Sequence, residues 1–280
     1  MDKILPNFLI IGAQKAGTSW LARQLQKHPD IFLYDHEIHF FDKKYNYGKG
    51  IDWYAKHFEG SGNKRMVGEK TPDYLWANGR GVEGHLPDVH INIYSNLPNI
   101  KLIAVLRNPV DRAISALNHI IHSGRVSPFL NINELLMGSK KHLVEGHGVL
   151  DYGRYHTLLT AFYDYFSAEN ILVLIFEEDV IVNPEQGLKK VCNFLGVDAS
   201  YDFGYIRQRI NENRGNNVTR IINYYLPILR PFIRRISRFL PNKKLKPSKD
   251  TIQKLFEFYK EENQKLFNLL GREIPTWKKD

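Results

Sequence analysis

The stretch "FLIIGAQKAGTSWL", residues 8–21, joins a short apolar run to a glycine-containing loop and a segment of helical period. Phe8–Ile11 is apolar without alternation, as expected of a strand that is buried on both faces. A helix that begins at Thr18 directs its unpaired backbone amides and the positive end of its dipole at the loop, and such a helix start binds anions. We therefore predict an anion-binding loop between a buried strand and a helix.

The lysine of this loop is displaced from the position that nucleotide triphosphatases use. Gly12 and Gly17 keep the spacing of G-x-x-x-x-G-K-[ST], but Thr18 occupies the lysine position and the lysine lies upstream, at Lys15. The usual lysine reaches the β- and γ-phosphates while the next hydroxyl holds Mg²⁺. Asp179 follows a predicted strand only after two glutamates, so no clear carboxylate partner for magnesium compensates. A tight turn with an incidental lysine is the structural alternative.

Apolar β-branched runs alternate with helical segments along the chain, which is typical of a parallel sheet covered by helices. We predict an α/β, three-layer P-loop-like fold with a central parallel β-sheet flanked by helices, and a single domain over residues 1–280. The predicted strands are Phe8–Ile11, Met66–Gly68, Leu102–Leu106 and Ile171–Phe176. The predicted helices start at Thr18, near Pro109, near Tyr152, at Pro184 and at Ser248, and Gly196 and Gly271 suit the ends of the last two.

The length, the single cysteine and the short N-terminal apolar run limit the classes of protein to which this chain can belong. With 280 residues and 43% apolar content, the chain can bury one substantial core. Its single cysteine, Cys192, has apolar neighbours and cannot form an intramolecular disulfide, so we expect a buried thiol. The apolar run before Gly12 is too short for a signal segment or a membrane span. We expect a cytoplasmic protein without a transmembrane segment.

The net charge of +9 arises from one segment, residues 219–249, which holds nine Lys and Arg and no acidic residue. The rest of the chain has equal numbers of basic and acidic residues, 30 of each. This distribution argues against a nucleic-acid-binding protein with an extended basic face and favours a local contact with an anionic partner.

Several motifs resemble the sulfotransferases that use 3′-phosphoadenosine 5′-phosphosulfate (PAPS). "PNFLIIGAQKAGTSWL" is similar to their 5′-phosphosulfate loop, and "LIAVLRNPVDRAISALNH" to their 3′-phosphate motif. "HEIHFFD" and "EKTPDYLW" resemble the glycosaminoglycan branch, which includes heparan sulfate sulfotransferases and bacterial relatives. The resemblance covers roughly residues 6–200 and resumes at the ending "LLGREIPTW".

The resemblance implies PAPS as the co-substrate and transfer of a sulfuryl group to a hydroxyl or amine of a glycan, a lipid or a carrier-bound metabolite. A sulfuryl group has one negative charge fewer than a phosphoryl group, so a lysine can stabilise the leaving group directly and no metal is implied. Lys15 is implied to contact the bridging oxygen of the phosphosulfate. The implied phosphosulfate loop consists of Lys15, Ala16, Gly17, Thr18, Ser19 and Trp20.

A second anion contact is predicted at the end of another strand. Arg107 ends the run "KLIAVLR", and Ser115 follows eight residues later with a helix start at Pro109 between them. This spacing can bring a guanidinium and a helical hydroxyl to one anion, and the planar fork of arginine binds phosphate oxygens in pairs. In the resembled family the matching residues bind the 3′-phosphate. The alternatives are an ion pair between Arg107 and Asp111 and an ordinary helical hydroxyl at Ser115.

Acceptor chemistry is expected around Glu37 and His39, which alternate with Ile38 in a predicted extended segment and so share a side. Transfer to an alcohol or amine needs a group that takes its proton, and a carboxylate with a raised pKa or a neutral imidazole can do so. The resemblance implies Glu37 as the base, with His39, Asp42 and Lys70 around it. Two alternatives remain open, namely His39 as the base and a structural ion pair between Glu37 and Lys70.

The C-terminal third matches the family less well. "NENRGNN", residues 211–217, is the best counterpart of a basic glycine-containing loop that closes the nucleotide site, and it offers Arg214 and Gly215. The basic aromatic segment 219–249 forms either a solvated cap on the core or a cover beside the acceptor entrance, and we favour the cover, with an anionic acceptor. A metal-dependent nucleotide kinase remains the alternative enzyme. A non-catalytic anion- or membrane-surface-binding protein is the alternative without catalysis.

Overall fold

The computed structural model describes residues 3–76, 84–206, 216–232 and 244–278. Its centre is a five-stranded, fully parallel sheet with the strand order β2-β3-β1-β4-β5. The predicted fold class is thereby confirmed. The strands are β1 Phe8–Gly12, β2 Ile31–Leu33, β3 Met66–Lys70, β4 Lys101–Leu106 and β5 Ile171–Ile175.

The first strand occupies the middle of the sheet because all of its side chains are apolar or small enough to be buried. Phe8 pairs with Gly68 of β3 on one side and with Lys101 of β4 on the other. A Cβ atom at Gly68 would lie 2.6 Å from the Phe8 carbonyl oxygen, so only glycine allows the two strands to approach at this point. Every residue of β1 and β3 is buried, which requires cover on both faces.

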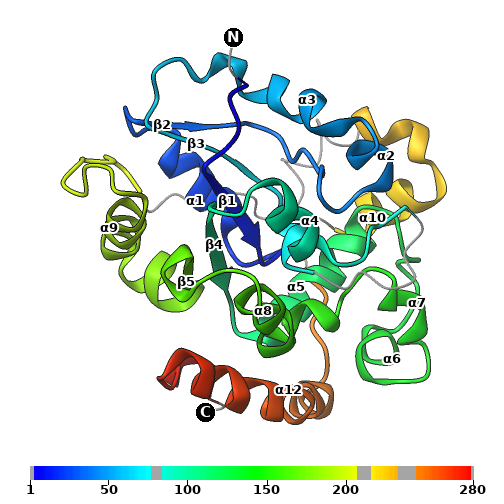
Figure 1. Cartoon of the computed structure of the whole chain (residues 1–280). Helices are drawn as coiled ribbons and strands as arrows, with labels where there is room; N and C mark the ends of the chain where they lie inside the picture. The colour runs from blue at the N-terminus through cyan, green and yellow to red at the C-terminus, as the bar shows by residue number, and fades with distance from the viewer. Residues whose placement is uncertain (1–2, 77–83, 207–215, 233–243, 279–280) are drawn as a thin grey trace.

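Helices provide this cover in two groups (Figure 1). One group consists of α1, which packs on β1, β2 and β3, and α9, which contacts α1 and β5. In the other group α12 packs on α8, α5 and α6, and an apolar cluster joins α5, α6 and α12. The α-helices are α1 Thr18–Leu25, α2 Lys44–Tyr47, α3 Gly50–Ala55, α4 Val89–Asn96, α5 Pro109–His122, α6 Ile132–Met137, α7 His142–Glu145, α8 Tyr155–Tyr163, α9 Pro184–Leu195, α10 Asn217–Tyr225 and α12 Lys249–Leu270.

Shorter helical turns link these elements. Six of the described turns are 3₁₀-helical: η1 Lys56–Ser61, η2 Pro72–Leu75, η3 Asp151–Gly153, η4 Ala168–Asn170, η6 Pro227–Leu229 and η8 Pro275–Trp277. The turn that follows β5, η5 Phe176–Val182, is instead a π-helix.

The long elements begin and end where their boundary residues predict. The helices expected at Thr18, Pro109 and Pro184 start there. The Ser248 hydroxyl caps α12 by accepting a hydrogen bond from the Thr251 amide. Gly196 and Gly271 adopt the left-handed conformation that ends α9 and α12.

Four local predictions need correction. Strand β3 extends to Lys70, two residues beyond its predicted end at Gly68. Strand β2 was not predicted, because three residues are too short for a periodic signal. Strand β5 ends at Ile175, one residue earlier than predicted, because Phe176 already belongs to η5. The helix expected near Tyr152 begins at Tyr155, after η3.

The expected packing residues are buried. Cys192 lies within the main core with a free thiol. Tyr152, Tyr155 and Phe162 are also buried and belong to the main core. Within the described ranges, no helix has the length and apolar character needed to cross a bilayer.

Candidate functional site

The candidate site forms at the edge of the sheet where all five parallel strands have their carboxyl ends, the usual place for ligands in such sheets. Each strand contributes at least one residue at or soon after its end. These residues are Lys15 after β1, Glu37 and His39 after β2, Lys70 at the end of β3, Arg107 after β4 and Phe176 after β5. The predicted site residues thus come together by the geometry of the sheet.

The loop after β1 leaves the start of α1 open. Gly17 precedes the helix in a left-handed conformation, φ 95°, and no side chain caps the first amides of α1. A Cβ atom at Gly17 would lie 2.7 Å from the Phe176 ring, so both the conformation and the contact require glycine here. Ala16 and Thr18 are buried, and Trp20 is anchored by its indole N–H, which donates to the Ile206 carbonyl oxygen at 2.8 Å. Uncapped amides at a helix start fit an anionic ligand.

Lys15 is half-buried among other cations. Burial lowers its pKa to about 8, with the charges of Arg107, Lys244 and Lys70 acting in the same direction. The charge of Glu37 raises this pKa and only partly opposes them. Four cationic groups therefore lie within electrostatic range of one point beside the open helix start. Such a cluster favours a multiply charged anion, which would offset the repulsion.

Arg107 faces the loop instead of pairing with Asp111. One guanidinium N–H of Arg107 donates to the Lys15 carbonyl oxygen at 3.2 Å, and the guanidinium lies 5.1 Å from the centre of the Phe176 ring. Asp111 is exposed, and the buried Arg107 Nε has no hydrogen-bond partner among the described residues. Ser115 is half-buried on α5, whose start is capped by Asn108. A buried donor without a partner fits an oxygen of a bound anion.

On the acceptor side, Glu37, His39 and Asp42 form a hydrogen-bonded chain. His39 Nδ1 lies 2.9 Å from Asp42 Oδ2, and His39 Nε2 lies 3.5 Å from Glu37 Oε2. The Lys70 ammonium donates to the other Glu37 oxygen at 2.5 Å. The expected common side for Glu37 and His39 is observed, but the segment is not extended, because His39 has φ 52°. A left-handed turn at His39 brings its ring back toward Glu37.

The expected protonation states of this chain were wrong. Burial favours a raised pKa for Glu37, but the hydrogen bond from His39 and the charge of Lys70 outweigh burial and lower this pKa to about 2. Burial also lowers the pKa of His39, yet hydrogen bonds to Asp42 and Glu37 outweigh it and raise this pKa to about 10. In this arrangement Glu37 is ionised and the imidazole is charged, so neither the carboxylate with a raised pKa nor the neutral imidazole is present.

The described residues offer little for a metal. His39, Asp42 and Asp73 bring ligand-type atoms within 4.8 Å of one another, but this group contains the hydrogen-bonded His39–Asp42 pair, and we assign no metal to it. Asp179, the weak candidate for a magnesium ligand, is buried and accepts hydrogen bonds from the Ile175 amide at 2.7 Å and from Lys190 at 2.6 Å. These contacts make Asp179 a support of the turn after β5.

Four residues near the site were missed or set aside at the level of sequence. Phe176 contacts both Gly17 and Arg107, and it could have been found as the residue that follows the last parallel strand. The charge of Lys244 helps to lower the pKa of Lys15, and burial, with the charges of Arg220 and Lys15, lowers the pKa of His122. His85 Nε2 lies 3.7 Å from Asp42 Oδ2. His85 and His122 therefore lie near the site, and no pattern in the sequence marks them. The predicted residues Arg214 and Gly215 lie outside the described ranges.

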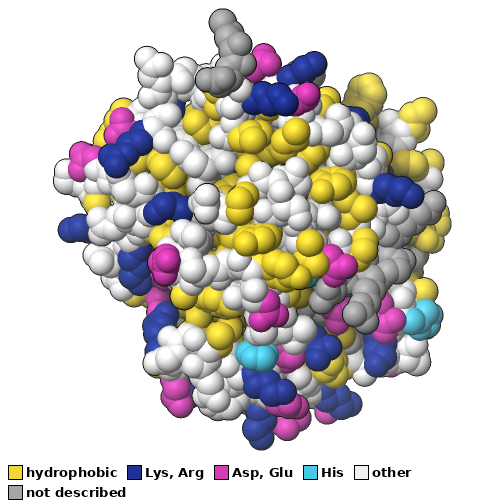
Figure 2. Space-filling model, in the orientation of Figure 1, with side chains coloured by type: hydrophobic (Ala, Val, Ile, Leu, Met, Phe, Trp, Pro, Cys, Tyr) yellow, Lys and Arg dark blue, Asp and Glu magenta, His cyan; other side chains and the backbone are white. Residues whose placement is uncertain are grey.

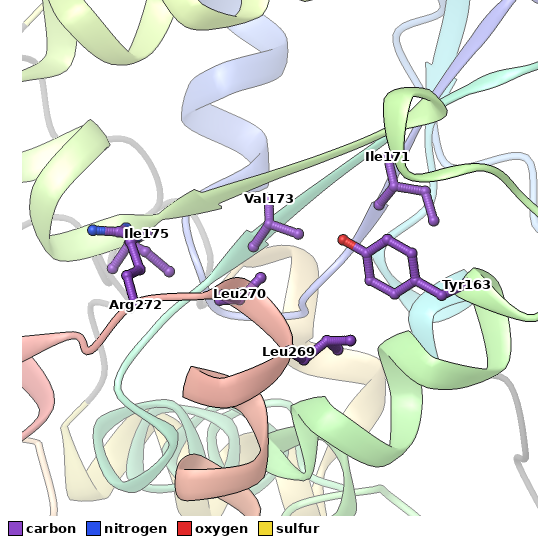
Figure 3. A pocket seen from close by; sticks show the side chains of 7 residues that line it. All are labelled: Tyr163, Ile171, Val173, Ile175, Leu269, Leu270 and Arg272. Carbon is purple, nitrogen blue, oxygen red and sulfur yellow. The ribbon is translucent and has the colours of Figure 1, made fainter.

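A separate pocket lies along the outer edge of β5 (Figure 3). Its lining comes from α8, β5 and the region where α12 ends: Tyr163, Ile171, Val173, Ile175, Leu269, Leu270 and Arg272. The pocket is mostly lined by apolar side chains and contains none of the cations of the loop. It is therefore distinct from the candidate site.

A family model of the sulfotransferase domain matches residues 5–222, which include the loop, the Glu37 chain and Arg107. The chain belongs to the sulfotransferase family. This family consists of enzymes, and the resemblance noted in the motifs is confirmed. A solved sulfotransferase from Alicyclobacillus acidocaldarius is 25% identical, with a TM-score of 0.71 over 99% of this chain and 100% of that chain.

Two curated sulfotransferases show how far the similarity extends. The chain is 41% identical over 115 residues to the membrane-associated sulfotransferase kil1 of Dictyostelium discoideum, covering 40% of this chain and 22% of that protein. It is 24% identical over 280 residues to heparan sulfate glucosamine 3-O-sulfotransferase 3B1 of Mus musculus, covering 98% of this chain and 65% of that protein. This sulfotransferase chain thus spans less than two thirds of either relative.

The lowered pKa of Lys15 predicts pH-dependent nucleotide binding. Above a pKa of about 8 the free protein loses this cation, so the affinity for 3′,5′-ADP should be about tenfold lower at pH 9 than at pH 7. Calorimetry at the two pH values measures the change. A Lys15→Arg variant keeps its charge over this range and should lose the dependence. An equal decline in the arginine variant would assign the titration to another group.

Proposed function

We propose that this sulfotransferase transfers a sulfuryl group from PAPS to a hydroxyl or amine of its acceptor by in-line displacement. The observation that carries the proposal is the meeting, at one sheet edge, of a cation cluster with an ionised carboxylate. Lys15 lies within range of Arg107 and Lys70 on one hand and of Glu37 on the other. The cation cluster suits a doubly phosphorylated nucleotide, and the Glu37 carboxylate suits the role of proton acceptor.

The two ends of the nucleotide have separate candidates. The open start of α1 with Lys15 suits the 5′-phosphosulfate, since uncapped amides and a cation stabilise the charge that develops on the leaving group. Arg107, whose Nε has no partner among the described residues, and Ser115 suit the 3′-phosphate. The Phe176 ring lies against both Gly17 and the Arg107 guanidinium, between the two candidate anion contacts. The proposed chemistry involves no metal.

We assign Glu37 as the proton acceptor, with Lys70 as the group that controls it. Among the described residues, the Lys70 ammonium donates to Glu37, and this ion pair adds to the larger effect of the His39 hydrogen bond in holding the Glu37 pKa low. The sulfonate group of PAPS is an anion, so it competes with Glu37 for Lys70. When Lys70 turns to it, the Glu37 pKa rises and the carboxylate becomes a stronger base. His39 stays protonated between Glu37 and Asp42 and orients the carboxylate.

For the acceptor we propose an anionic molecule, such as a sulfated or carboxylated glycan, an acidic carrier protein or a substrate at an anionic membrane. Lys244, in the basic segment 219–249, lies close enough to Lys15 to lower its pKa, which supports a position beside the site. The described part of this segment breaks at Pro227, where η6 follows α10, and Ile228 and Phe232 are exposed. Residues 233–243 lie outside the described ranges.

Nucleic acid is not proposed as a partner. On the face seen in Figure 2, basic and acidic side chains are intermixed, unlike the continuous basic surface that nucleic-acid binding requires. A cytoplasmic location remains a prediction from the sequence.

A screen of sulfate transfer from PAPS over glycans, lipids and carrier-bound metabolites, with and without Mg²⁺, tests the proposed reaction. Transfer that required ATP and Mg²⁺ would contradict it.

Arg107 should discriminate between nucleotides by their 3′-phosphate. Arg107→Ala is expected to weaken 3′,5′-ADP binding by about 2 kcal/mol or more, as when a charged hydrogen-bonded pair is broken. Binding of 5′-AMP, which lacks the 3′-phosphate, should hardly change. Calorimetry with both nucleotides measures the difference. Equal losses for both would remove the 3′-phosphate assignment.

Lys15 and Glu37 should both affect the chemical step. Lys15→Ala removes charge stabilisation and Glu37→Gln removes the base, so each should lower kcat by about a hundredfold or more. Glu37→Gln should leave 3′,5′-ADP affinity nearly unchanged, because it does not alter the cation cluster. Steady-state kinetics and calorimetry separate the two effects. A Glu37→Gln variant with most of its turnover, beside an inactive His39→Ala variant, would move the base to His39.

Charge reversal in the basic segment tests the anionic acceptor. A triple variant with Arg234, Arg235 and Arg238 changed to Glu should raise the acceptor KM and flatten its salt dependence, without changing 3′,5′-ADP affinity. The matched control reverses three exposed lysines of α12, namely Lys254, Lys260 and Lys265. The control has the same net charge but should keep the acceptor KM. An unaltered KM with only a lower Tm in the first variant would make the segment structural.

A further inference from the structure

Glu69, on β3 between Gly68 and Lys70, is a fully buried carboxylate that the proposed chemistry does not use. The hydrogen-bond donors that reach it among the described residues are three hydroxyls. Tyr74 donates to Oε1 at 2.7 Å, Tyr54 donates to the same oxygen at 3.1 Å, and Thr71 donates to Oε2 at 2.7 Å. Burial raises the Glu69 pKa to about 7, although the three hydrogen bonds oppose this change. Burial of a carboxylate in such a position costs folding free energy, so we expect Glu69 to have a specific role.

In its ionised form, which the three donated hydrogen bonds favour, Glu69 accepts hydrogen bonds and cannot donate them. It therefore makes each surrounding hydroxyl point its hydrogen inward, so that the lone pairs of the hydroxyl oxygens face away from Glu69. Two of these oxygens accept hydrogen bonds from consecutive backbone amides. The Tyr74 oxygen accepts from the Phe40 amide at 2.9 Å, and the Thr71 oxygen accepts from the His39 amide at 3.4 Å.

These two amides belong to the turn that forms the acceptor side of the site. His39 has a left-handed φ of 52°, which is uncommon for a residue other than glycine and is maintained by its surroundings. On one side of the turn, the His39 ring meets Glu37 and Asp42. On the other side, Phe40 is buried and its amide has no access to water, so loss of the Tyr74 oxygen would leave a buried donor unpaired.

We propose that Glu69 is a positioning residue, which acts through the Tyr74 and Thr71 hydroxyls to hold the His39–Phe40 turn and so to place the His39 ring between Glu37 and Asp42. Its role is to set the direction of a hydrogen-bond network. The consequence for catalysis rests on the proposed function of Glu37. The effect on His39 is a property of the folded protein and holds for any reaction.

Tyr54 provides a matched control for Tyr74. Both tyrosines are fully buried, and both hydroxyls donate to Glu69 Oε1. The difference that matters here is their contact with Phe40. The Tyr74 oxygen accepts a hydrogen bond from the Phe40 amide, whereas the Tyr54 ring stacks on the Phe40 ring with the ring centres 4.5 Å apart. Replacement by phenylalanine keeps both rings, so Tyr54→Phe and Tyr74→Phe each remove one hydrogen bond to Glu69. Only Tyr74→Phe also releases the turn.

The decisive measurement is the pKa of His39 by nuclear magnetic resonance of the imidazole in the full-length protein without ligand. In the unchanged protein this pKa is raised to about 10 by Asp42 and Glu37. Tyr74→Phe should lower it by about one pH unit or more, because the ring moves away from the two carboxylates. Tyr54→Phe should leave it unchanged. Equal His39 pKa values in both variants would overturn the proposal.

Kinetics then connects the turn with catalysis. Tyr74→Phe and Glu69→Gln should lower kcat by about tenfold or more, because a small misplacement of a catalytic group is costly, and should keep 3′,5′-ADP affinity within about twofold. Thr71→Val should also lower kcat, whereas Thr71→Ser keeps the hydroxyl and should restore most of it. Tyr54→Phe should lower Tm but keep kcat.

The outcomes separate this inference from the proposed function. A shifted His39 pKa in Tyr74→Phe, in a protein that transfers no sulfuryl group, would support the positioning role and refute the reaction. Transfer by the unchanged protein, with the same kcat in Tyr54→Phe and Tyr74→Phe, would refute the positioning role alone. If Tyr74→Phe does not fold, the comparison of Thr71→Val with Thr71→Ser provides the same test with a smaller change of volume.

Discussion

The repulsion between cations at one edge of the sheet is the constraint on which the site depends. Lys15, Lys70, Arg107 and Lys244 lie close enough together that burial and mutual repulsion lower the Lys15 pKa to about 8. A protein gains no stability from such an arrangement, since like charges in a poorly solvated place disfavour their own charged forms. The cluster becomes favourable when a multiply charged anion is bound. Under the proposed function, nucleotide binding and the protonation of Lys15 are therefore linked.

The parallel sheet explains how residues far apart in sequence reach this edge. Its carboxyl ends point in one direction, so each connection that leaves a strand starts at the site. Phe176 shows the consequence, because the residue that directly follows the last strand lies against both Gly17 and Arg107. The Tyr155 hydroxyl donates to the Arg107 carbonyl oxygen at 2.9 Å and holds the end of β4 from α8. The rigid core thus fixes the distance between the two anion contacts.

The acceptor side is built on a different principle, which is a chain of charged hydrogen bonds around a strained turn. Glu37 is ionised in this structure, yet its pairing with Lys70 and His39 makes it a weak base. In the proposed reaction, the nucleotide at the cation cluster also competes for Lys70, which couples the two sides of the site. Such coupling keeps the base weak until the donor is present. In the proposed positioning role, Glu69 holds the His39–Phe40 turn in the same conformation while these charges change.

The sequence by itself determined four of the five described strands, the starts of several long helices and a set of residues that meet at one edge of the sheet, because these signals are local. The apolar runs predicted β1, β3, β4 and β5, Gly17 and Pro109 predicted helix starts, and the motifs predicted Lys15, Glu37, His39, Lys70 and Arg107 as neighbours. Only the tertiary structure decided the protonation of Glu37 and His39, the contacts of Phe176 and Lys244, and the network of Glu69. A pKa depends on burial and on charges brought from distant parts of the chain, and a hydrogen-bond network depends on distances of a few ångströms. Spacing along a sequence contains neither.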